Sequence, residues 1–152
     1  MVLFRERVYA APWMFLVTVL LVPAAIAVFA PIHPPSGLQW GIGVGIGLYA
    51  AIVLALAFGA PLLVVTDAAF HAGRAMVERQ YVGAVEVYEG AAAREQRGPA
   101  LDARAWLLLR GSLPVVKIWI ADDSDPVPYW LVSTRRPHEL ARTLTGAEVA
   151  PR

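Results

Sequence analysis

The sequence predicts a membrane-spanning helical hairpin followed by a small α+β domain. From Val8 to Thr66 the chain has 59 residues without Asp, Glu, Lys or Arg, and a Pro-Pro-Ser-Gly turn from Pro34 to Gly37 divides this run in two. Each half is long enough to cross a bilayer, since about 20 apolar residues cover its hydrocarbon core. Beyond the run, short stretches that alternate polar and apolar residues are typical of strands with one buried face.

The first predicted span covers residues 12–32 and follows a cytoplasmic N-terminal segment, residues 1–11. Pro12 suits the first position of a helix, where its missing N–H would have no partner. Tyr9 and Trp13 are the expected interface residues, because amphipathic rings favour the headgroup level. Pro23 removes one backbone hydrogen bond in the middle of the span, so we expect a kink between Val19 and Pro23.

The second predicted span covers residues 38–61, after an external turn at residues 33–37. Trp40 is its expected interface residue. Glycines four residues apart let another helix backbone approach closely, and we expect the first span to pack there; they are Gly41, Gly43, Gly45 and Gly47. The same glycines do not match a dinucleotide-binding loop, which follows a strand, opens a helix and precedes an acidic residue.

The distribution of cations predicts the orientation of the spans. Arg5 and Arg7 precede the first span, Arg74 and Arg79 follow the second, and the connecting turn has no cation. The positive-inside rule then places both termini in the cytoplasm and the protein in the plasma (inner) membrane. The alternative is a cleaved signal peptide over residues 1–27, with Ala25-Ile26-Ala27 as the small-residue cleavage site.

A cytoplasmic domain is predicted over residues 62–147, followed by a tail at residues 148–152. The expected strands include residues 62–66, the alternating residues around Val85 and Val87, and a hairpin formed by residues 115–121 and 128–134. Two helices are expected, one over residues 90–97 before Gly98-Pro99 and one that begins at Pro137 and ends at Gly146. Strands covered by a C-terminal helix make an α+β domain with one small core.

Three segments of the chain carry a resemblance to a known family. The sequence resembles an actinobacterial family of small membrane proteins, domain of unknown function 3093, at residues 5–7 (Arg-Glu-Arg), 81–87 (Tyr-Val-Gly-Ala-Val-Glu-Val) and 129–140 (Tyr-Trp-Leu-Val-Ser-Thr-Arg-Arg-Pro-His-Glu-Leu). The resemblance covers almost the whole chain. It implies two transmembrane helices and a cytoplasmic domain similar to the bacterial pleckstrin-homology fold, a β-sheet or partial barrel closed by a C-terminal helix. It implies no catalytic residue.

The composition and motifs argue against several kinds of chemistry. Residues 67–152 hold eleven basic and eleven acidic residues, so they lack the basic footprint that nucleic acids require. The chain has no cysteine. The predicted topology separates His33 from His71 and His138, the Asp122 to Asp125 loop lacks the pattern of an EF-hand, and Ser133 lies outside any nucleophile elbow. We therefore expect no enzyme, no metal and no cofactor.

One group of basic residues is a candidate binding site. Arg135 and Arg136 stand between the last strand and the C-terminal helix, where Arg110 and Lys117 converge with them if the fold is pleckstrin-like. Guanidinium groups suit bidentate recognition of phosphate or carboxylate. The other interpretation is that Arg135 and Arg136 pair with Glu139 and the Asp122 to Asp125 loop as surface charges.

The sequence thus predicts a membrane protein without enzymatic activity. Its cytoplasmic domain is expected to bind another protein, or a second copy of the chain, or to scaffold a complex at the bilayer. The alternative is that the basic group binds anionic lipid headgroups, to which each nearby basic side chain adds about 1 kcal/mol.

Overall fold

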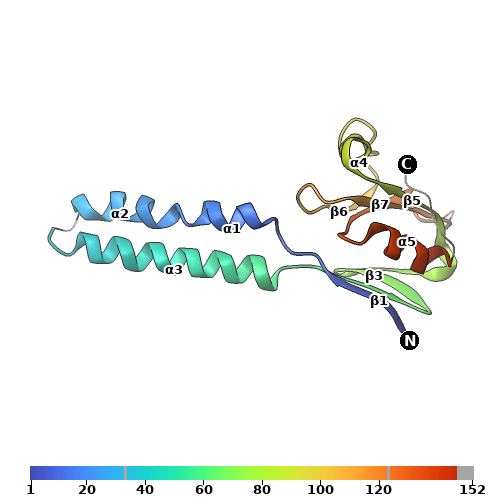
Figure 1. Cartoon of the computed structure of the whole chain (residues 1–152), viewed down its shortest axis with the longest axis horizontal. Coiled ribbons are helices and arrows are strands. Elements are labelled where there is room, and N and C mark those ends of the chain that lie inside the picture. The colour runs from blue at the N-terminus through green and yellow to red at the C-terminus, as the bar shows by residue number, and fades with distance from the viewer. Residues whose placement is uncertain (33, 123, 147–152) are drawn as a thin grey trace. The chain divides into compact units, whose positions relative to one another are not determined.

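The computed structural model describes residues 1–32, 34–122 and 124–146, and it divides into a helical unit and a sheet unit (Figure 1). The helical unit contains residues 9–60. The sheet unit combines residues 1–8 with the chain from Pro61 onward. Two stretches, Pro12–Ile32 and Gly37–Phe58, are long and apolar enough to cross a membrane, as the sequence predicts.

The first predicted span consists of two helices in succession, α1 (Pro12–Thr18) and α2 (Leu21–Ile32). Val19 and Leu20 interrupt the regular helix at the place where the kink is predicted. Pro23 has no N–H to donate to the Val19 carbonyl, and that carbonyl accepts a hydrogen bond from the Val22 N–H at 3.1 Å instead. The interruption therefore re-satisfies the group that proline leaves open.

The second predicted span is a single helix, α3 (Gly37–Phe58), which packs along α2. A Cβ atom on Gly41 would lie 2.6 Å from the Ile26 Cα, and one on Gly45 would lie 2.7 Å from the Val22 Cα. These two glycines form the predicted close contact with the first span. Gly43 and Gly47 do not, because nothing lies within 4 Å of a Cβ atom at either position.

The first sheet of the sheet unit has the strand order β1-β2-β3-β4, with every neighbouring pair antiparallel. Its strands are β1 (Val2–Arg7), β2 (Leu62–Thr66), β3 (Ala69–Ala72) and β4 (Ala75–Glu78). β1 precedes the helical unit in sequence and β2 follows it. The N-terminal residues, predicted to form a separate segment, therefore belong to the folded unit, and Phe4 and Val8 are buried in its core.

The second sheet has the order β5-β7-β8-β6. Its strands are β5 (Val82–Tyr88), β6 (Trp106–Leu108), β7 (Val115–Ile120) and β8 (Tyr129–Ser133). β7 and β8 pair antiparallel with Val116 opposite Val132, which confirms the predicted hairpin. The 3-10 helix η1 (Arg79–Tyr81) leads into β5, and α4 (Gly90–Arg97) has the predicted bounds.

The C-terminal helix α5 (Pro137–Thr145) packs on strands of both sheets. It ends at Gly146, whose φ of 72° is the left-handed conformation that glycine adopts without strain. Leu140, Ala141 and Leu144 of α5 join Phe70 and Ile118 in the main core. The unit is a sheet-rich domain with a C-terminal helix, and over the residues that the structure describes its two four-stranded sheets do not join into a closed barrel.

Candidate functional site

Arg135 and Arg136, the two central residues of the predicted basic group, hold strand β1 against the start of α5. The Glu6 carboxylate is 6% exposed and accepts hydrogen bonds from the Thr134 hydroxyl and, at 3.0 Å, from the Arg135 backbone N–H. The Arg135 guanidinium lies 3.4 Å from Glu6 through Nε and donates from Nη2 to the Arg7 carbonyl at 2.8 Å. This arrangement fixes the strand that leads into the first span.

Arg136 makes the same kind of connection one residue further along the chain. Its Nη1 donates to Glu139 at 3.1 Å, and its Nη2 donates to the Arg5 carbonyl at 2.6 Å. The guanidinium also lies over the Phe4 ring, 4.6 Å from the ring centroid, in cation–π geometry. Glu139 is therefore a partner of Arg136, as the surface-charge interpretation predicts, while Arg135 pairs with the buried Glu6.

The structure places the backbone of Arg110 next to this group and places Lys117 elsewhere. The Arg110 N–H donates to the Ser133 hydroxyl at 3.0 Å, one residue before Thr134. Lys117 is 8% exposed. Its Nζ lies 4.1 Å from the Tyr129 ring centroid and 4.6 Å from that of Trp119, and it donates to Gln96 at 3.2 Å. The predicted convergence of all four basic residues is wrong for Lys117, whose ammonium lies over two aromatic rings and bonds to α4.

Basic side chains gather at one end of the sheet unit, the end at which the chain enters the helical unit. We call this the span end and define it by Val8 and Pro61, which are joined by a hydrogen bond of 3.0 Å. The β3–β4 turn with Arg74 lies there, since the Gly73 N–H donates to the Leu62 carbonyl at 2.9 Å. The contacts above place three further cations at the same end, namely Arg7, Arg110 and Arg135.

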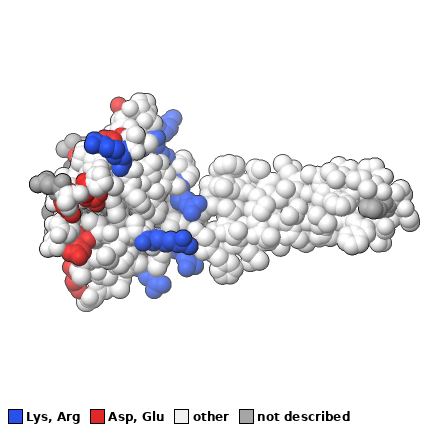
Figure 2. Space-filling view, turned by 180° about the vertical axis from the view of Figure 1, so that it is seen from behind, with Lys and Arg blue, Asp and Glu red and all other residues white. Residues whose placement is uncertain are grey.

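Acidic side chains gather at the opposite, distal end of the sheet unit. Asp67 lies in the β2–β3 turn, Glu78 ends β4, and Asp122 and Asp125 lie in the β7–β8 loop. The register places these turns away from the span end, because Ala69 pairs with Glu78 while Ala72 pairs with Ala75. On the face seen in Figure 2, most blue side chains and most red side chains of the unit lie at opposite ends.

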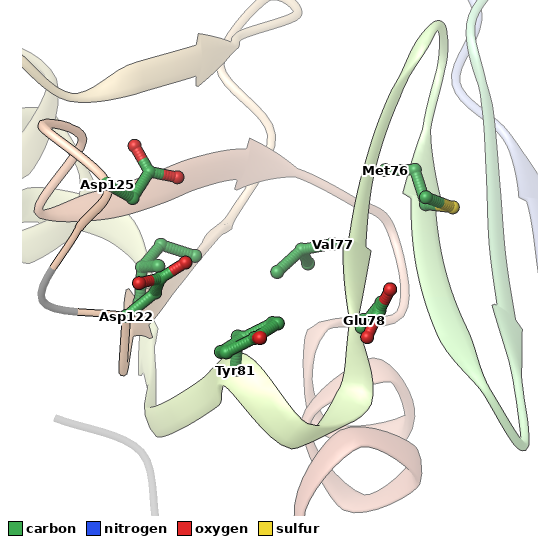
Figure 3. Close-up of a pocket in the computed structure, with 7 residues that line it drawn as sticks. Met76, Val77, Glu78, Tyr81, Asp122 and Asp125 are labelled. Carbon is green, nitrogen blue, oxygen red and sulfur yellow. The ribbon is translucent and has the colours of Figure 1, made fainter.

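A pocket opens at the distal end between β4 and the β7–β8 loop (Figure 3). Its volume is about 220 Å³. Glu78 lines it from β4, and Asp122 and Asp125 line it from the facing loop. Apolar and aromatic side chains complete the lining, namely Met76, Val77, Tyr81 and Ile120.

The pocket carboxylates are held by local hydrogen bonds. Asp122 Oδ1 accepts from the Ser124 hydroxyl at 2.6 Å and from the Ser124 N–H at 2.9 Å. These two bonds lower the pKa of Asp122 below its usual 3.8, because they stabilise the charged form. Asp125 Oδ1 accepts from the Val127 N–H at 2.9 Å, and Glu78 accepts from the Gln80 side chain at 2.6 Å.

The remaining candidate residues occupy structural positions. His71 lies in β3, and His138, in the first turn of α5, lies 3.5 Å from Glu89. Ser133 is buried. Among the described residues no group of His, Cys, Asp or Glu is arranged to hold a metal ion. His33, Asp123 and the predicted tail at residues 148–152 lie outside the described residues.

The predicted interface residues are exposed on the helical unit. Tyr9, Trp13 and Trp40 are 45%, 62% and 61% exposed, as rings that contact lipid headgroups need to be. Tyr9 and Trp13 flank the start of α1, and Trp40 lies in the first turn of α3. Their place at a bilayer interface stays a prediction.

Sequence reasoning missed Glu6 and the pocket. One signal for Glu6 was available, because Phe4, Glu6 and Val8 alternate with Arg5 and Arg7 in the period of a strand with one buried face. The pocket had no such signal. It joins β4 to a loop more than 40 residues later in the chain.

Comparison with known proteins adds one finding. A family model described as a protein of unknown function (DUF3093) matches residues 3–144, which includes both predicted spans and nearly all of the sheet unit. No curated protein and no solved structure matches the chain.

Proposed function

The chain belongs to the family of proteins of unknown function DUF3093, and from the charge distribution of its sheet unit we propose that it is a membrane-anchored, non-enzymatic interaction protein. The spans cross the plasma membrane with both flanking segments in the cytoplasm. The basic span end lies at the inner leaflet, and the acidic distal end is presented to a protein partner. The segregation of charge between the two ends of the sheet unit is the observation that carries this proposal.

The pairing of β1 with β2 supports the proposed topology. Arg7 pairs with Leu62 and Val2 with Thr66, so the residues before the first span and after the second form one sheet. Strands joined in this way lie on the same side of a bilayer. Cleavage of residues 1–27 would remove β1 and uncover the edge of β2, so the pairing also supports two spans over a signal peptide.

Short connections support a position close to the bilayer. Residues 8–11 separate β1 from α1, and residues 59–61 separate α3 from β2. Fully extended, these segments reach about 14 Å and about 10 Å. With the spans in the membrane, the span end is held near the headgroups, where Arg7, Arg74 and Arg110 match the negative inner leaflet.

The buried polar groups support a role without catalysis. The Glu6 carboxylate accepts one hydrogen bond from the Thr134 hydroxyl and another from the Arg135 backbone N–H. Ser133 receives the Arg110 N–H, and Lys117 packs on Trp119 and Tyr129. Each of these contacts joins two parts of the fold, which is the ordinary use of a buried polar side chain.

We also propose that the arrangement of strands is pleckstrin-like. Two antiparallel-rich sheets follow each other in sequence, and a C-terminal helix packs on strands of both.

An origin in actinobacteria, which the resemblance implies, likewise stays a prediction.

The proposal is tested by crosslinking in intact membranes followed by affinity purification of the full chain. A defined partner that co-purifies in constant ratio is the expected result. A monodisperse chain from which crosslinking recovers neither a partner nor a second copy contradicts the proposal.

Binding of anionic headgroups is a second candidate function, favoured by the gathering of Arg7, Arg74, Arg110 and Arg135 at the span end. In nanodiscs, hydrogen exchange of the turn at Gly73 and Arg74 is expected to be slower with anionic lipid than with zwitterionic lipid. The double variant Arg74→Glu and Arg110→Glu removes this difference, whereas Arg104→Glu, in the loop before β6, leaves it. Equal exchange in both lipids excludes this function.

A further inference from the structure

The distal pocket has the size of a site for one side chain. Its volume of about 220 Å³ is below the roughly 300–1,000 Å³ of typical small-molecule sites. Glu78 lines the pocket from β4, and Asp122 and Asp125 line it from the loop on its other side (Figure 3). The apolar lining from Val77 and Ile120 suits an aliphatic stem, and the carboxylates suit a charged tip.

The carboxylates have capacity for a further ligand. An ionised carboxylate offers about four lone-pair sites on its two oxygens. The local hydrogen bonds of Asp122 and Asp125 use Oδ1 in each case. The pocket therefore combines negative charge with acceptor atoms, and the complementary group is an ammonium or a guanidinium.

The strand beside the pocket suits an extended ligand. β4 is the terminal strand of the first sheet, with β3 as its one strand neighbour among the described residues. A terminal strand offers backbone groups to an added strand, which is a common mode of peptide recognition. Met76, next to the pocket on β4, is 55% exposed and offers an apolar contact at the rim.

We propose that the distal pocket binds an Arg or Lys side chain of a protein partner, presented from an extended segment that lies along β4. This inference rests on the proposed function and names the surface and the partner chemistry that it needs. Charge complementarity identifies the occupant. A membrane surface does not fit, because the pocket lies at the end of the sheet unit opposite Val8 and Pro61.

Site-specific photo-crosslinking of the full chain in its native membrane tests the inference. A photoreactive amino acid replaces Met76 at the pocket rim, and a parallel chain carries it at Leu107 of β6, which is 42% exposed and belongs to the other sheet. The expected result is a crosslink from position 76 to a partner peptide that carries Arg or Lys beside the crosslinked residue. The peptide is identified by mass spectrometry.

A matched pair of variants tests the charge. The triple variant Glu78→Gln, Asp122→Asn and Asp125→Asn keeps an oxygen acceptor at every position, so the local hydrogen bonds that shape the loop are retained. It is expected to lower the crosslink yield at position 76 about tenfold, as loss of charge-assisted hydrogen bonds predicts. Glu95→Gln, a neutralised acid on the exposed surface of α4 and outside the distal end, leaves the yield unchanged. Circular dichroism checks that both variants fold.

The outcomes separate this inference from the proposed function. A partner crosslinked at position 107 but not at 76 overturns the pocket and leaves the interaction function standing. A crosslink at 76 that the triple variant does not weaken, or a partner peptide without a nearby cation, also overturns the pocket. No partner at either position contradicts both.

Discussion

At the scale of single residues, Glu6 is the side chain that joins strand β1 to the segment between β8 and α5. Its carboxylate is buried and accepts hydrogen bonds from the Thr134 hydroxyl and the Arg135 backbone N–H. It also forms an ion pair with the Arg135 guanidinium. Because Glu6 lies on β1 and its donors follow β8, these bonds connect residues almost 130 positions apart. A charged acceptor in this position contributes more than a neutral one.

The substitution Glu6→Gln is predicted to destabilise the sheet unit by about 1.5–3 kcal/mol, because it replaces charge-assisted hydrogen bonds at a buried site. For a unit of this size the melting temperature falls by roughly 4–8 °C per kcal/mol. Thermal unfolding of the full chain in detergent measures the effect. Glu95→Gln, on the exposed surface of α4, is the control, and equal melting temperatures for the two variants would show that Glu6 has no special role.

The lowered pKa of Asp122 predicts how its contribution to stability changes with pH. Its pKa is lowered by the Ser124 hydroxyl and N–H, so its contribution to stability is present above about pH 3.8 and is lost as the pH falls through the lower pKa of the folded state. The variant Ser124→Ala removes the larger cause and is expected to raise the pKa of Asp122. Nuclear magnetic resonance with carboxyl-labelled aspartate measures it, and the pKa of Asp102, lowered by Arg104, serves as the unchanged reference.

At the scale of elements, the two glycine pairs of α3 differ although their sequence pattern is the same. Gly41 and Gly45 touch α2, whereas Gly43 and Gly47 face open space. The rotation of a helix about its axis decides which pair is used. Repeated glycines therefore predict close packing but not the face on which it occurs.

We predict that Gly41→Leu disrupts the helical unit and that Gly43→Leu does not. A Cβ atom at position 41 overlaps the backbone at Ile26, so the helices must separate at a cost of about 1–3 kcal/mol or more. Loss of helical circular dichroism on heating in detergent is the measurement. If both variants melt together, the observed packing of α2 on α3 is contradicted.

Local signals explain which elements the sequence predicts. The β7–β8 hairpin, α4 and α5 are marked by alternation, by Gly98 and Gly146 and by the acidic loop, all within a few residues of each element. The interruption at Val19 follows from Pro23 in the same way. β1 is different, because its partner β2 lies beyond the 54 residues from Val8 to Pro61, and no local pattern indicates a pairing at that distance.

The contrast between local and long-range signals also explains how the predicted basic group differs from the observed one. Arg135 and Arg136 are adjacent in sequence, so their proximity is trivial, and Arg110 reaches them through Ser133. Lys117 alternates with Val116 and Ile118 on β7 and therefore lies on the opposite face of the sheet from the main core. The separation of Lys117 from the arginines follows from the alternating direction of side chains along β7, which the identities of the basic residues alone do not indicate.

At the scale of the whole molecule, the β1–β2 pairing predicts an even number of membrane crossings between the two strands. The chain has no cysteine, so single cysteines can be introduced without background. At Val2 and Ser112, both exposed in the sheet unit, an introduced cysteine is expected to react with an impermeant maleimide only after the cells are permeabilised. At Ser36, in the turn between the spans, it is expected to react in intact cells.

A single reversed site would contradict this topology. Reaction at Ser112→Cys in intact cells would place the sheet unit outside the cytoplasm. Reaction at Val2→Cys but not at Ser112→Cys would separate two segments that the structure joins in one folded unit.

The pairing of β1 with β2 also determines the order in which the protein can mature. β1 is synthesised first, and its partner strand β2 emerges only after both predicted spans have been made, so β1 cannot pair before then. A chain in which only one of the two spans crossed the bilayer would hold β1 and β2 on opposite sides, with the edge of β2 uncovered and the core places of Phe4 and Val8 empty. The first sheet can therefore be completed only when both spans cross or neither does, which couples the folding of the sheet unit to the pairwise insertion of the spans.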